Sequence, residues 1–411
     1  MPDPNQSRRK GAAPTEVHKC GSGAFSILTY NNIAAAGLAR FPVDRYTVGA
    51  DVADADAILV RSADLHDTAL PPSLKAVGRA GSGVNNIPVA ALTQRGIPVF
   101  NAPGANANAV KELVVAGLLI AARNLTAAWD FARTAGADIE SAKKRYAGFE
   151  LPGRTLGVVG LGAIGVEVCN AAQALGMRVV GFDPQVTVQR AWQLSASVEQ
   201  ARTLDDLLPR CDFVSLHVPL NEHTRGLLDA ECLRLLPECA VVLNLARAGI
   251  VDDDAVLAAL GAGRLHAYVT DFPTPALVRH PRVIALPHLG ASTREAEENC
   301  AVQVADTLRE FLEHGVLRHS VNFPDASLPP VTDGWRVAIA NANVPNMVGQ
   351  VTAVLGGAGL NIIDMLNRSR GDVAWTVLDL DAEVGADTLA AIRAIDGILS
   401  ARVIGPAGES P

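Results

Sequence analysis

A glycine-rich segment near the middle of the chain constrains the fold more than any other feature. Residues 156–165 read Leu-Gly-Val-Val-Gly-Leu-Gly-Ala-Ile-Gly, so an apolar strand runs directly into three glycines spaced as G-x-G-x-x-G. An amphipathic helix follows and ends at Gly176, and a second apolar strand then leads to Asp183. This order of strand, glycine turn, helix, strand and acid predicts a dinucleotide-binding βαβ unit.

The three glycines have separate physical roles in such a unit. Gly160 allows a tight turn, Gly162 lets the backbone approach a pyrophosphate, and Gly165 lets the helix pack closely on the strand. The unpaired N–H groups at the start of the helix, around Ala163 and Ile164, then face the anion.

The acid at the end of the second strand selects between the two common dinucleotides. The carboxylate of Asp183 suits the hydroxyl groups of a ribose and repels a 2′-phosphate. The sequence therefore favours NAD over NADP as the cofactor.

The composition limits the classes of protein to which the chain can belong. Its 411 residues suggest two to three domains, and 49% apolar with 19% charged residues indicates large buried cores. The net charge of -8 argues against nucleic acid or an anionic membrane as the main partner. Six cysteines show no metal-ligand spacing, and residues 1–23 lack the apolar segment of a secretory signal. We therefore expect a cytoplasmic protein with reduced thiols, in which the apolar run Leu113–Ala122 is a buried helix.

The order of apolar segments predicts three folded parts. From Phe25, short strands alternate with helical stretches, as in a parallel α/β sheet, and Asn106 or Asn108 can cap a long helix. From Thr155, the pattern continues as a doubly wound sheet of about six strands. Beyond a linker at 325–334, the order is β-α-β-β-α-β, the ferredoxin-like arrangement.

Three polar residues follow strands of the predicted doubly wound sheet. Arg247, Asp271 and His288 each stand at the carboxyl end of a strand, where ligands of open α/β sheets bind. Arginine offers a rigid set of donors for a carboxylate, and histidine can move the proton that accompanies hydride transfer. Taken singly, each has an ordinary structural explanation. His217, inside a buried strand, and His280, in a proline-flanked loop, are assigned structural and surface positions.

Longer motifs around these residues resemble those of the D-2-hydroxyacid dehydrogenases. The resemblance rests on Leu-Asn-Leu-Ala-Arg-Ala-Gly-Ile-Val-Asp at 243–252 and Leu-Pro-His-Leu-Gly-Ala-Ser-Thr at 286–293. Val-Arg-Ser at 60–62 and Gly-Arg-Ala-Gly-Ser-Gly-Val-Asn-Asn at 78–86 resemble the branch of that family that oxidises D-3-phosphoglycerate for serine synthesis. The C-terminal unit resembles the ACT domains through which many of those enzymes sense serine.

The resemblance implies an α/β fold with two Rossmann-like doubly wound domains and a ferredoxin-like ACT domain. The substrate-binding domain would be discontinuous, at 25–107 and 296–330. The NAD-binding domain would occupy 108–295 and the ACT domain 335–405, after a flexible tail at 1–24. The family also implies a homodimer or homotetramer.

Roles for individual residues follow from the same resemblance. Arg247 would grip the carboxylate and carbonyl oxygen of the substrate, and His288 would take the hydroxyl proton. Asp271 would orient the nicotinamide amide, with Val218 and Pro219 on the adenine side. The remaining cofactor contacts that it implies are Ala246 and Gly290.

The resemblance also places the substrate phosphate and carboxylate. The loop at 81–84 would offer backbone N–H groups to the carboxylate, although an ordinary turn is the alternative. Arg61 and Arg79 would lie near the phosphate, while Lys143 and Lys144 either join them or form a solvated charge run. The substrate-binding residues implied in this way are Arg61, Ser62, Arg79, Ser82, Gly83 and Val84.

One departure from the family pattern concerns the partner of the histidine. The family pairs it with a glutamate, whereas Pro275 or Ala276 stands at that position and no acid lies between Asp271 and His288. Three interpretations remain: a weakened relay, a substitute carboxylate from Glu295 or Glu298, or a chain that binds NAD and senses ligands with little turnover. Since general acid–base catalysis is worth roughly 10²–10⁴-fold in all, we expect a reduced but measurable rate.

The C-terminal unit carries candidates for an effector site. Asn341, Asn343 and Asn361 occupy positions that hold an effector amino acid in the resembling ACT domains, and asparagine both donates and accepts hydrogen bonds. The alternative is that they cap strands and form turns. L-serine is the expected effector.

Two rival functions also remain: dehydrogenation of another D-2-hydroxy acid, such as glycerate or glyoxylate, and NAD-responsive regulation with vestigial activity.

Overall fold

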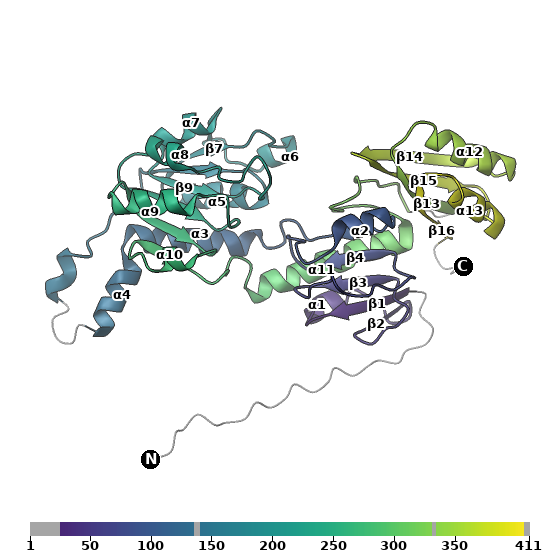
Figure 1. Cartoon of the computed structure of the whole chain (residues 1–411), viewed down its shortest axis with the longest axis horizontal. Coiled ribbons are helices and arrows are strands. Elements are labelled where there is room, and N and C mark those ends of the chain that lie inside the picture. The colour runs from purple at the N-terminus through teal and green to yellow at the C-terminus, as the bar shows by residue number, and fades with distance from the viewer. Residues whose placement is uncertain (1–24, 135–139, 331–333, 407–411) are drawn as a thin grey trace, which may run out of the picture. The chain divides into compact units, whose positions relative to one another are not determined.

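The computed structural model describes residues 25–134, 140–330 and 334–406, so the predicted tail at 1–24 lies outside the described residues. Two compact units divide the chain (Figure 1). The first comprises Met1–Ala102 with Ala301–Pro411, and the second comprises Pro103–Cys300.

The second unit is built on a parallel sheet of seven strands in the order β12-β11-β10-β9-β6-β7-β8. The sequence predicts about six strands. The additional one is the two-residue edge strand β8, which is too short and polar to give a strand pattern. The strands are β6 (Thr155–Val159), β7 (Arg178–Phe182), β8 (Glu199–Gln200), β9 (Phe213–Leu216), β10 (Ala240–Asn244), β11 (Leu265–Thr270) and β12 (Val283–Ala285).

Helices cover both faces of this sheet, as expected for a doubly wound fold. Neighbouring strand residues point to opposite faces, so Val158 packs in one apolar core and Val159 in another. The helical elements of this unit are α3 (Ala107–Ala122), α4 (Leu125–Thr134), η1 (Glu140–Lys144), α5 (Ala163–Ala174), α6 (Val188–Ala191), α7 (Leu204–Leu207), η2 (Leu208–Arg210), α8 (Ala230–Leu235), α9 (Asp253–Gly261) and α10 (Pro275–Val278).

Helix α3 contains the longest apolar run of the sequence and is a core helix. Val114 and Leu118 on this helix are fully buried against the sheet. Asn106 is its N-cap residue, but its side chain makes no capping hydrogen bond, so the predicted asparagine cap is wrong in this respect. In the described residues no single helix is long and apolar enough to cross a membrane. The pair α3 and α4, bent by 64°, meets the length and composition criteria only when taken together.

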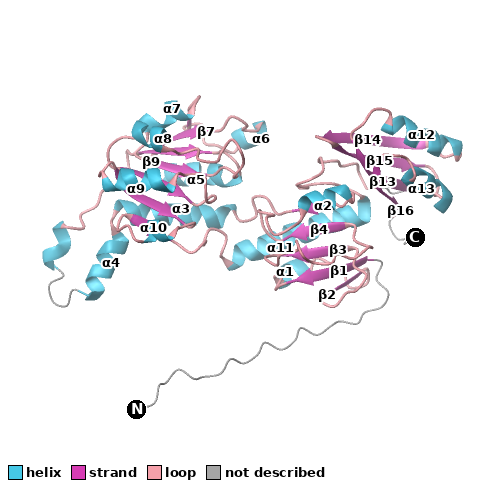
Figure 2. Cartoon of the chain, in the orientation of Figure 1, coloured by secondary structure: helices cyan, strands magenta, loops and turns pink. Residues whose placement is uncertain are grey.

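The first unit contains a parallel sheet of five strands in the order β2-β1-β3-β4-β5 (Figure 2). The sequence analysis missed β2, a half-buried strand without clear alternation. The elements of this sheet and its helices are β1 (Phe25–Tyr30), α1 (Ala35–Leu38), β2 (Tyr46–Gly49), β3 (Ala57–Val60), β4 (Ala76–Arg79), α2 (Val89–Gln94), β5 (Val99–Phe100) and α11 (Arg294–His314).

Helix α11 begins in the second unit and ends in the first. Its C-terminal half packs Val304, Leu308 and Phe311 on one face of the five-stranded sheet. The opposite face of that sheet buries Ile58 and Val77 against Leu92 of α2. Both faces of this parallel sheet are therefore covered as well.

The C-terminal part of the first unit is an antiparallel sheet of four strands in the order β14-β15-β13-β16. The β-α-β-β-α-β order predicted from the sequence is confirmed. One face of this sheet shares a core with α11, and the other buries Val351 and Ile392 of its own two helices. The elements are β13 (Trp335–Ala342), α12 (Met347–Gly357), β14 (Ile362–Arg370), β15 (Val373–Leu380), α13 (Ala386–Arg393) and β16 (Ile398–Ile404).

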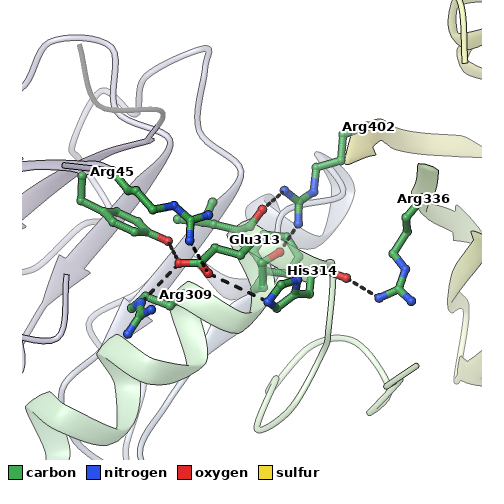
Figure 3. A network of polar contacts seen from close by, with 9 residues as sticks. Arg45, Arg309, Glu313, His314, Arg336 and Arg402 are labelled. Atoms are coloured by element: carbon green, nitrogen blue, oxygen red, sulfur yellow. Dashed lines mark hydrogen bonds and ion pairs between the residues drawn. The ribbon is translucent and has the colours of Figure 1, made fainter. Parts of the chain in front are cut away.

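Two arginines of the antiparallel sheet bind the carbonyl groups at the end of α11 (Figure 3). Arg336 donates to His314 O at 2.7 Å, and Arg402 donates to the carbonyls of Phe311 and Leu312. The last carbonyls of a helix have no partner within the helix, and cations are favoured there. The sheet therefore supplies the C-terminal cap of α11.

The Arg336 side chain is fully buried and also forms a bidentate pair with Asp379, at 2.6 and 2.8 Å. We expect Asp379→Ala to lower the free energy of unfolding by about 3–5 kcal/mol, because it leaves a buried guanidinium without its counter-charge. Urea unfolding measures this loss. The exposed Glu383→Ala is the matched control, and equal stability of the two variants would contradict the expectation.

Candidate active site

The glycine turn brings three backbone segments into direct contact. Gly160 has a φ of +92°, and a Cβ atom there would lie 2.6 Å from His217 O. A Cβ atom on Gly165 would collide with the carbonyl oxygen of Gly160. The predicted roles of these two glycines, a tight turn and close helix packing, are thus visible in the geometry.

Gly162 differs from both, because a Cβ atom there would meet nothing within 4 Å. It is the N-cap residue of α5, so this open space lies beside the start of the helix at Ala163 and Ile164. Asp183 lies just beyond β7 and accepts hydrogen bonds from Leu161 N and, with its other oxygen, from Gln185 N, both at 2.8 Å. This opening, bordered by helix N–H groups and a carboxylate, fits a dinucleotide.

Gly162→Ala therefore separates binding from folding. The added methyl group enters the open space, so we expect the unfolding midpoint to stay unchanged while NAD binds at least ~10-fold more weakly. Gly261→Ala, at the end of α9 and also without close neighbours, is the control. Fluorescence titration with NADH measures the effect, and equal affinity in both variants would place the pyrophosphate elsewhere.

Arg247, Asp271 and His288 follow β10, β11 and β12, which are adjacent in the sheet. Asn244 holds the first of these loops, because its side chain donates to Arg247 O and accepts from Ala246 N. Sequence reasoning assigned Asn244 no role, although a buried asparagine at the end of an apolar strand was a signal for one.

Asp271 is buried next to both other residues. Gly290 N donates to its Oδ2 at 3.1 Å, whereas its buried Oδ1 has no hydrogen-bond partner among the described residues. Burial raises the pKa of this carboxyl group, and the hydrogen bond from Gly290 and the charges of His288 and Arg247 oppose that rise. The unpartnered oxygen can accept a hydrogen bond from a ligand amide, which is what a nicotinamide offers.

His288 has a strained backbone and an aromatic neighbour. Its φ is +49°, and its ring lies 4.6 Å from that of Phe272, centroid to centroid. In the described part of the chain its imidazole pairs with no carboxylate. Glu295 and Glu298 pair with Arg294 instead, so the suggestion that either replaces the family's glutamate finds no support in the contacts. Pro275 and Ala276, at the expected glutamate position, form the first turn of α10.

The adenine side of the predicted cofactor site follows β9. Val218 is partly buried in the core beside this strand, and Pro219 is exposed. His217 hydrogen-bonds Ser215 Oγ at 2.9 Å, and burial lowers its pKa to about 4. His217 is therefore neutral at pH 7 and hydrogen-bonded to β9, the strand that it follows, which fits the structural role expected for it.

The residues predicted for substrate binding lie at the carboxyl ends of β3 and β4 in the first unit. Arg61 and Ser62 directly follow β3. Asn31 Oδ1 accepts from Ser62 N and Ala63 N, at 3.1 and 2.5 Å. The sequence analysis missed Asn31, whose position after β1 with a φ of +66° was the available signal.

Arg79 ends β4 and donates to Arg61 O at 3.0 Å. Its guanidinium group packs so closely on Gly81 that a Cβ atom at that glycine would collide with it. Asn101, also missed, donates to Ser82 O at 2.6 Å and fixes the loop that continues through Gly83 and Val84. The structure thus places the predicted loop beside the predicted phosphate-binding arginine.

The remaining candidates lie in two other parts of the chain. Lys143 pairs with Glu140 at 2.8 Å, and Lys144 is exposed beside it, in the second unit. In the antiparallel sheet, Asn341 is buried and hydrogen-bonds Thr376 and Ala342 O. Asn343 and Asn361 are exposed, and the side chain of Asn343 donates to Gly371 O.

Comparisons with known proteins agree with this geometry. Residues 115–290 match the D-isomer specific 2-hydroxyacid dehydrogenase, NAD binding domain. The D-3-phosphoglycerate dehydrogenase of Haemophilus influenzae is 33% identical over 347 residues, or 81% of this chain and 82% of that relative. That of Methanocaldococcus jannaschii is 38% identical over 285 residues, or 67% of this chain, which spans 53% of that relative's length. A glyoxylate reductase from Paecilomyes thermophila has a similar structure, with a TM-score of 0.62 and 26% identity over 72% of this chain and 98% of that one.

The chain therefore belongs to the D-isomer specific 2-hydroxyacid dehydrogenases, in the group that contains the D-3-phosphoglycerate dehydrogenases. It has the family's NAD-binding domain, and NAD is its cofactor. The open space at Gly162 fits the pyrophosphate of that cofactor, and the unpartnered oxygen of Asp271 fits its nicotinamide amide.

Proposed function

We propose that the protein oxidises D-3-phosphoglycerate to 3-phosphohydroxypyruvate with NAD, the first step of L-serine synthesis. The observation that carries this proposal is the adjacency of Arg247, Asp271 and His288 on three neighbouring strand ends. The relatives that are D-3-phosphoglycerate dehydrogenases support the choice of substrate. In this assignment 25–107 with 296–330 bind the substrate, and 108–295 bind NAD.

The residues of the chain would divide the reaction as follows. NAD, when bound, supplies the acceptor for the hydride that leaves C2 of the substrate. His288 would take the proton of the C2 hydroxyl, and Arg247 would hold the carboxylate and the oxygen on which carbonyl character develops. Asp271 would keep the nicotinamide oriented through its unpartnered Oδ1.

The ends of β3 and β4 would recognise the rest of the substrate. We assign the phosphate to Arg61 and Arg79, because guanidinium groups bind phosphate in a bidentate manner. The carboxylate would also contact the backbone N–H groups of Ser82, Gly83 and Val84.

NADH formation from D-3-phosphoglycerate and NAD, at pH 7 to 9, tests the proposal. We expect His288→Ala to lower kcat by roughly 10²–10⁴-fold, because it removes general acid–base catalysis. Binding of NADH, measured by fluorescence, serves as the control and should be unchanged. Turnover that survives in the variant would exclude His288 as the base.

A second function in the same family is oxidation of an unphosphorylated 2-hydroxy acid. The structural similarity to a glyoxylate reductase is the observation that favours it. The two arginines predicted for the phosphate favour the phosphorylated substrate instead. The ratio of kcat/KM for D-3-phosphoglycerate and D-glycerate, in the protein and in Arg61→Gln, distinguishes the two.

The position of the missing glutamate gives a gain-of-function test. Ala276 is exposed in the first turn of α10, so a larger side chain is tolerated there. We expect Ala276→Glu to raise kcat by up to about tenfold, since a carboxylate would orient the imidazole of His288 and stabilise its protonated form. The pH profile of kcat/KM and the equally exposed Val278→Glu serve as readout and control. No change in rate or profile would make the relay argument wrong.

For residues 335–405 we propose an ACT domain that binds L-serine between two copies of the chain, in a homodimer or homotetramer. The antiparallel sheet with two helices on one face supports this proposal. Asn343 and Asn361 are exposed and available to a ligand, whereas the buried Asn341 would act by fixing the neighbouring strand.

Calorimetry with L-serine tests this assignment. We expect saturable heat at millimolar serine or below, and a loss of affinity on the order of tenfold in Asn361→Ala, which removes a polar contact to the zwitterion. Glu383→Ala, at an exposed position between β15 and α13, is the control. Absence of heat at millimolar serine would exclude the effector site.

A further inference from the structure

A cavity of about 440 Å³ lies in the first unit between its two sheets. One wall is formed by 72–75, which leads into β4, and by 95–97, which follows α2. The other wall is formed by the antiparallel sheet at Trp375 and 398–402. Ser400 Oγ donates to Gly96 O at 2.9 Å and joins the two walls.

Four cationic side chains line this cavity: Lys75, Arg95, Arg393 and Arg402. Lys75 pairs with Asp56 at 2.8 Å, so its charge is neutralised nearby. The hydrogen bonds of the three guanidinium groups go to neutral carbonyls. Arg95 donates to Pro71 O, Arg393 to Ala401 O, and Arg402 to the end of α11. Three guanidinium groups therefore line the cavity without a carboxylate at ion-pair distance among the described residues, although Asp56, the partner of Lys75, acts on Arg402 from farther away.

Two buried N–H groups of lining residues also have no acceptor. The Trp375 side chain is 2% exposed, and its Nε1 has no hydrogen-bond partner in the described part of the chain. Nε of Arg402 also has no hydrogen-bond partner among the described residues, and burial lowers the pKa of this guanidinium group to about 10. Buried donors normally find a partner, so unpartnered ones on residues that line a cavity point to an acceptor that binds from outside. Both atoms are covered by neighbouring groups, so the acceptor reaches them after a small shift of the two side chains.

We propose that this cavity is a binding site for a small organic dianion, a dicarboxylate or a phosphate ester. Its oxygens accept hydrogen bonds from Trp375 and Arg402 at the buried end. The exposed guanidinium groups of Arg95 and Arg393 balance its charge toward solvent. The short carbon body of the ligand lies against Ile97, Phe311 and Leu399.

A ligand in this cavity would also affect the packing of the two sheets against each other. A ligand there contacts the parallel sheet through 95–97 and the antiparallel sheet through 398–402 at the same time. It also lies beside Phe311 and Arg402, which meet at the capped end of α11. Because such a ligand binds only when the two sheets are docked, it stabilises their docking, and the stabilisation grows with the logarithm of its concentration above the Kd.

Titration of the full-length protein with inorganic phosphate and, separately, with succinate tests the proposal. Tryptophan fluorescence is the readout. Of the four tryptophans only the buried Trp375 lines the cavity, whereas Trp129 and Trp192 are 70% and 86% exposed and the half-buried Trp335 lies outside it. We expect a saturable change below about 10 mM of at least one anion, and its loss in Trp375→Phe. The stronger of the two probes identifies the ligand as a phosphate ester or a dicarboxylate.

The double variant R95Q/R393Q removes two of the charges while leaving the buried donors in place. We expect it to bind the anion at least ~10-fold more weakly, since charge-assisted hydrogen bonds are lost. The control R368Q/R370Q removes two exposed charges from the same sheet, outside the cavity, and should bind as the parent protein does. The unfolding midpoint without anion confirms that both variants are folded. Equal affinity in the two double variants, or no saturable change with either anion, overturns the proposal.

Discussion

Direct contact between backbones at the glycine turn is the constraint on which the nucleotide-binding unit depends. The start of α5, the end of β6 and the end of β9 meet at Gly160 and Gly165, where no Cβ atom fits. That contact fixes where α5 begins, and so where its unpaired N–H groups point. It also fixes β6 beside β9, from which β10, β11 and β12 continue to the strand ends that carry the polar residues.

The same sheet brings three side chains together that are far apart in the sequence. Parallel neighbours end at one edge, so Arg247, Asp271 and His288 gather there without any local signal that links them. Burial of Asp271 has a cost, seen in its raised pKa, which the charges of the other two residues partly offset. A buried carboxylate with an unpartnered oxygen is a feature expected where a ligand completes the hydrogen bonding.

Helix α11 links both units through the chain itself. It begins shortly after His288 and ends under the antiparallel sheet, where Arg336 and Arg402 bind its last carbonyls. The cavity proposed to bind an anion is lined by Phe311 of the same helix end. The antiparallel sheet is therefore tied to the rest of the protein by hydrogen bonds and a shared core as well as by its linker.

The sequence by itself determined the βαβ unit, the parallel sheets and the β-α-β-β-α-β order, because apolar periodicity and glycine spacing are local properties of the chain. It also located Arg247, Asp271 and His288 at strand ends. It could not show β2 or the short edge strand β8, whose residues have no clear pattern, or that Asn31, Asn101 and Asn244 brace the loops. Only the tertiary structure decided that His288 has no carboxylate partner among the described residues, and that cationic side chains from separate segments line one cavity. Those outcomes depend on which distant side chains meet, and packing rather than local sequence sets such meetings.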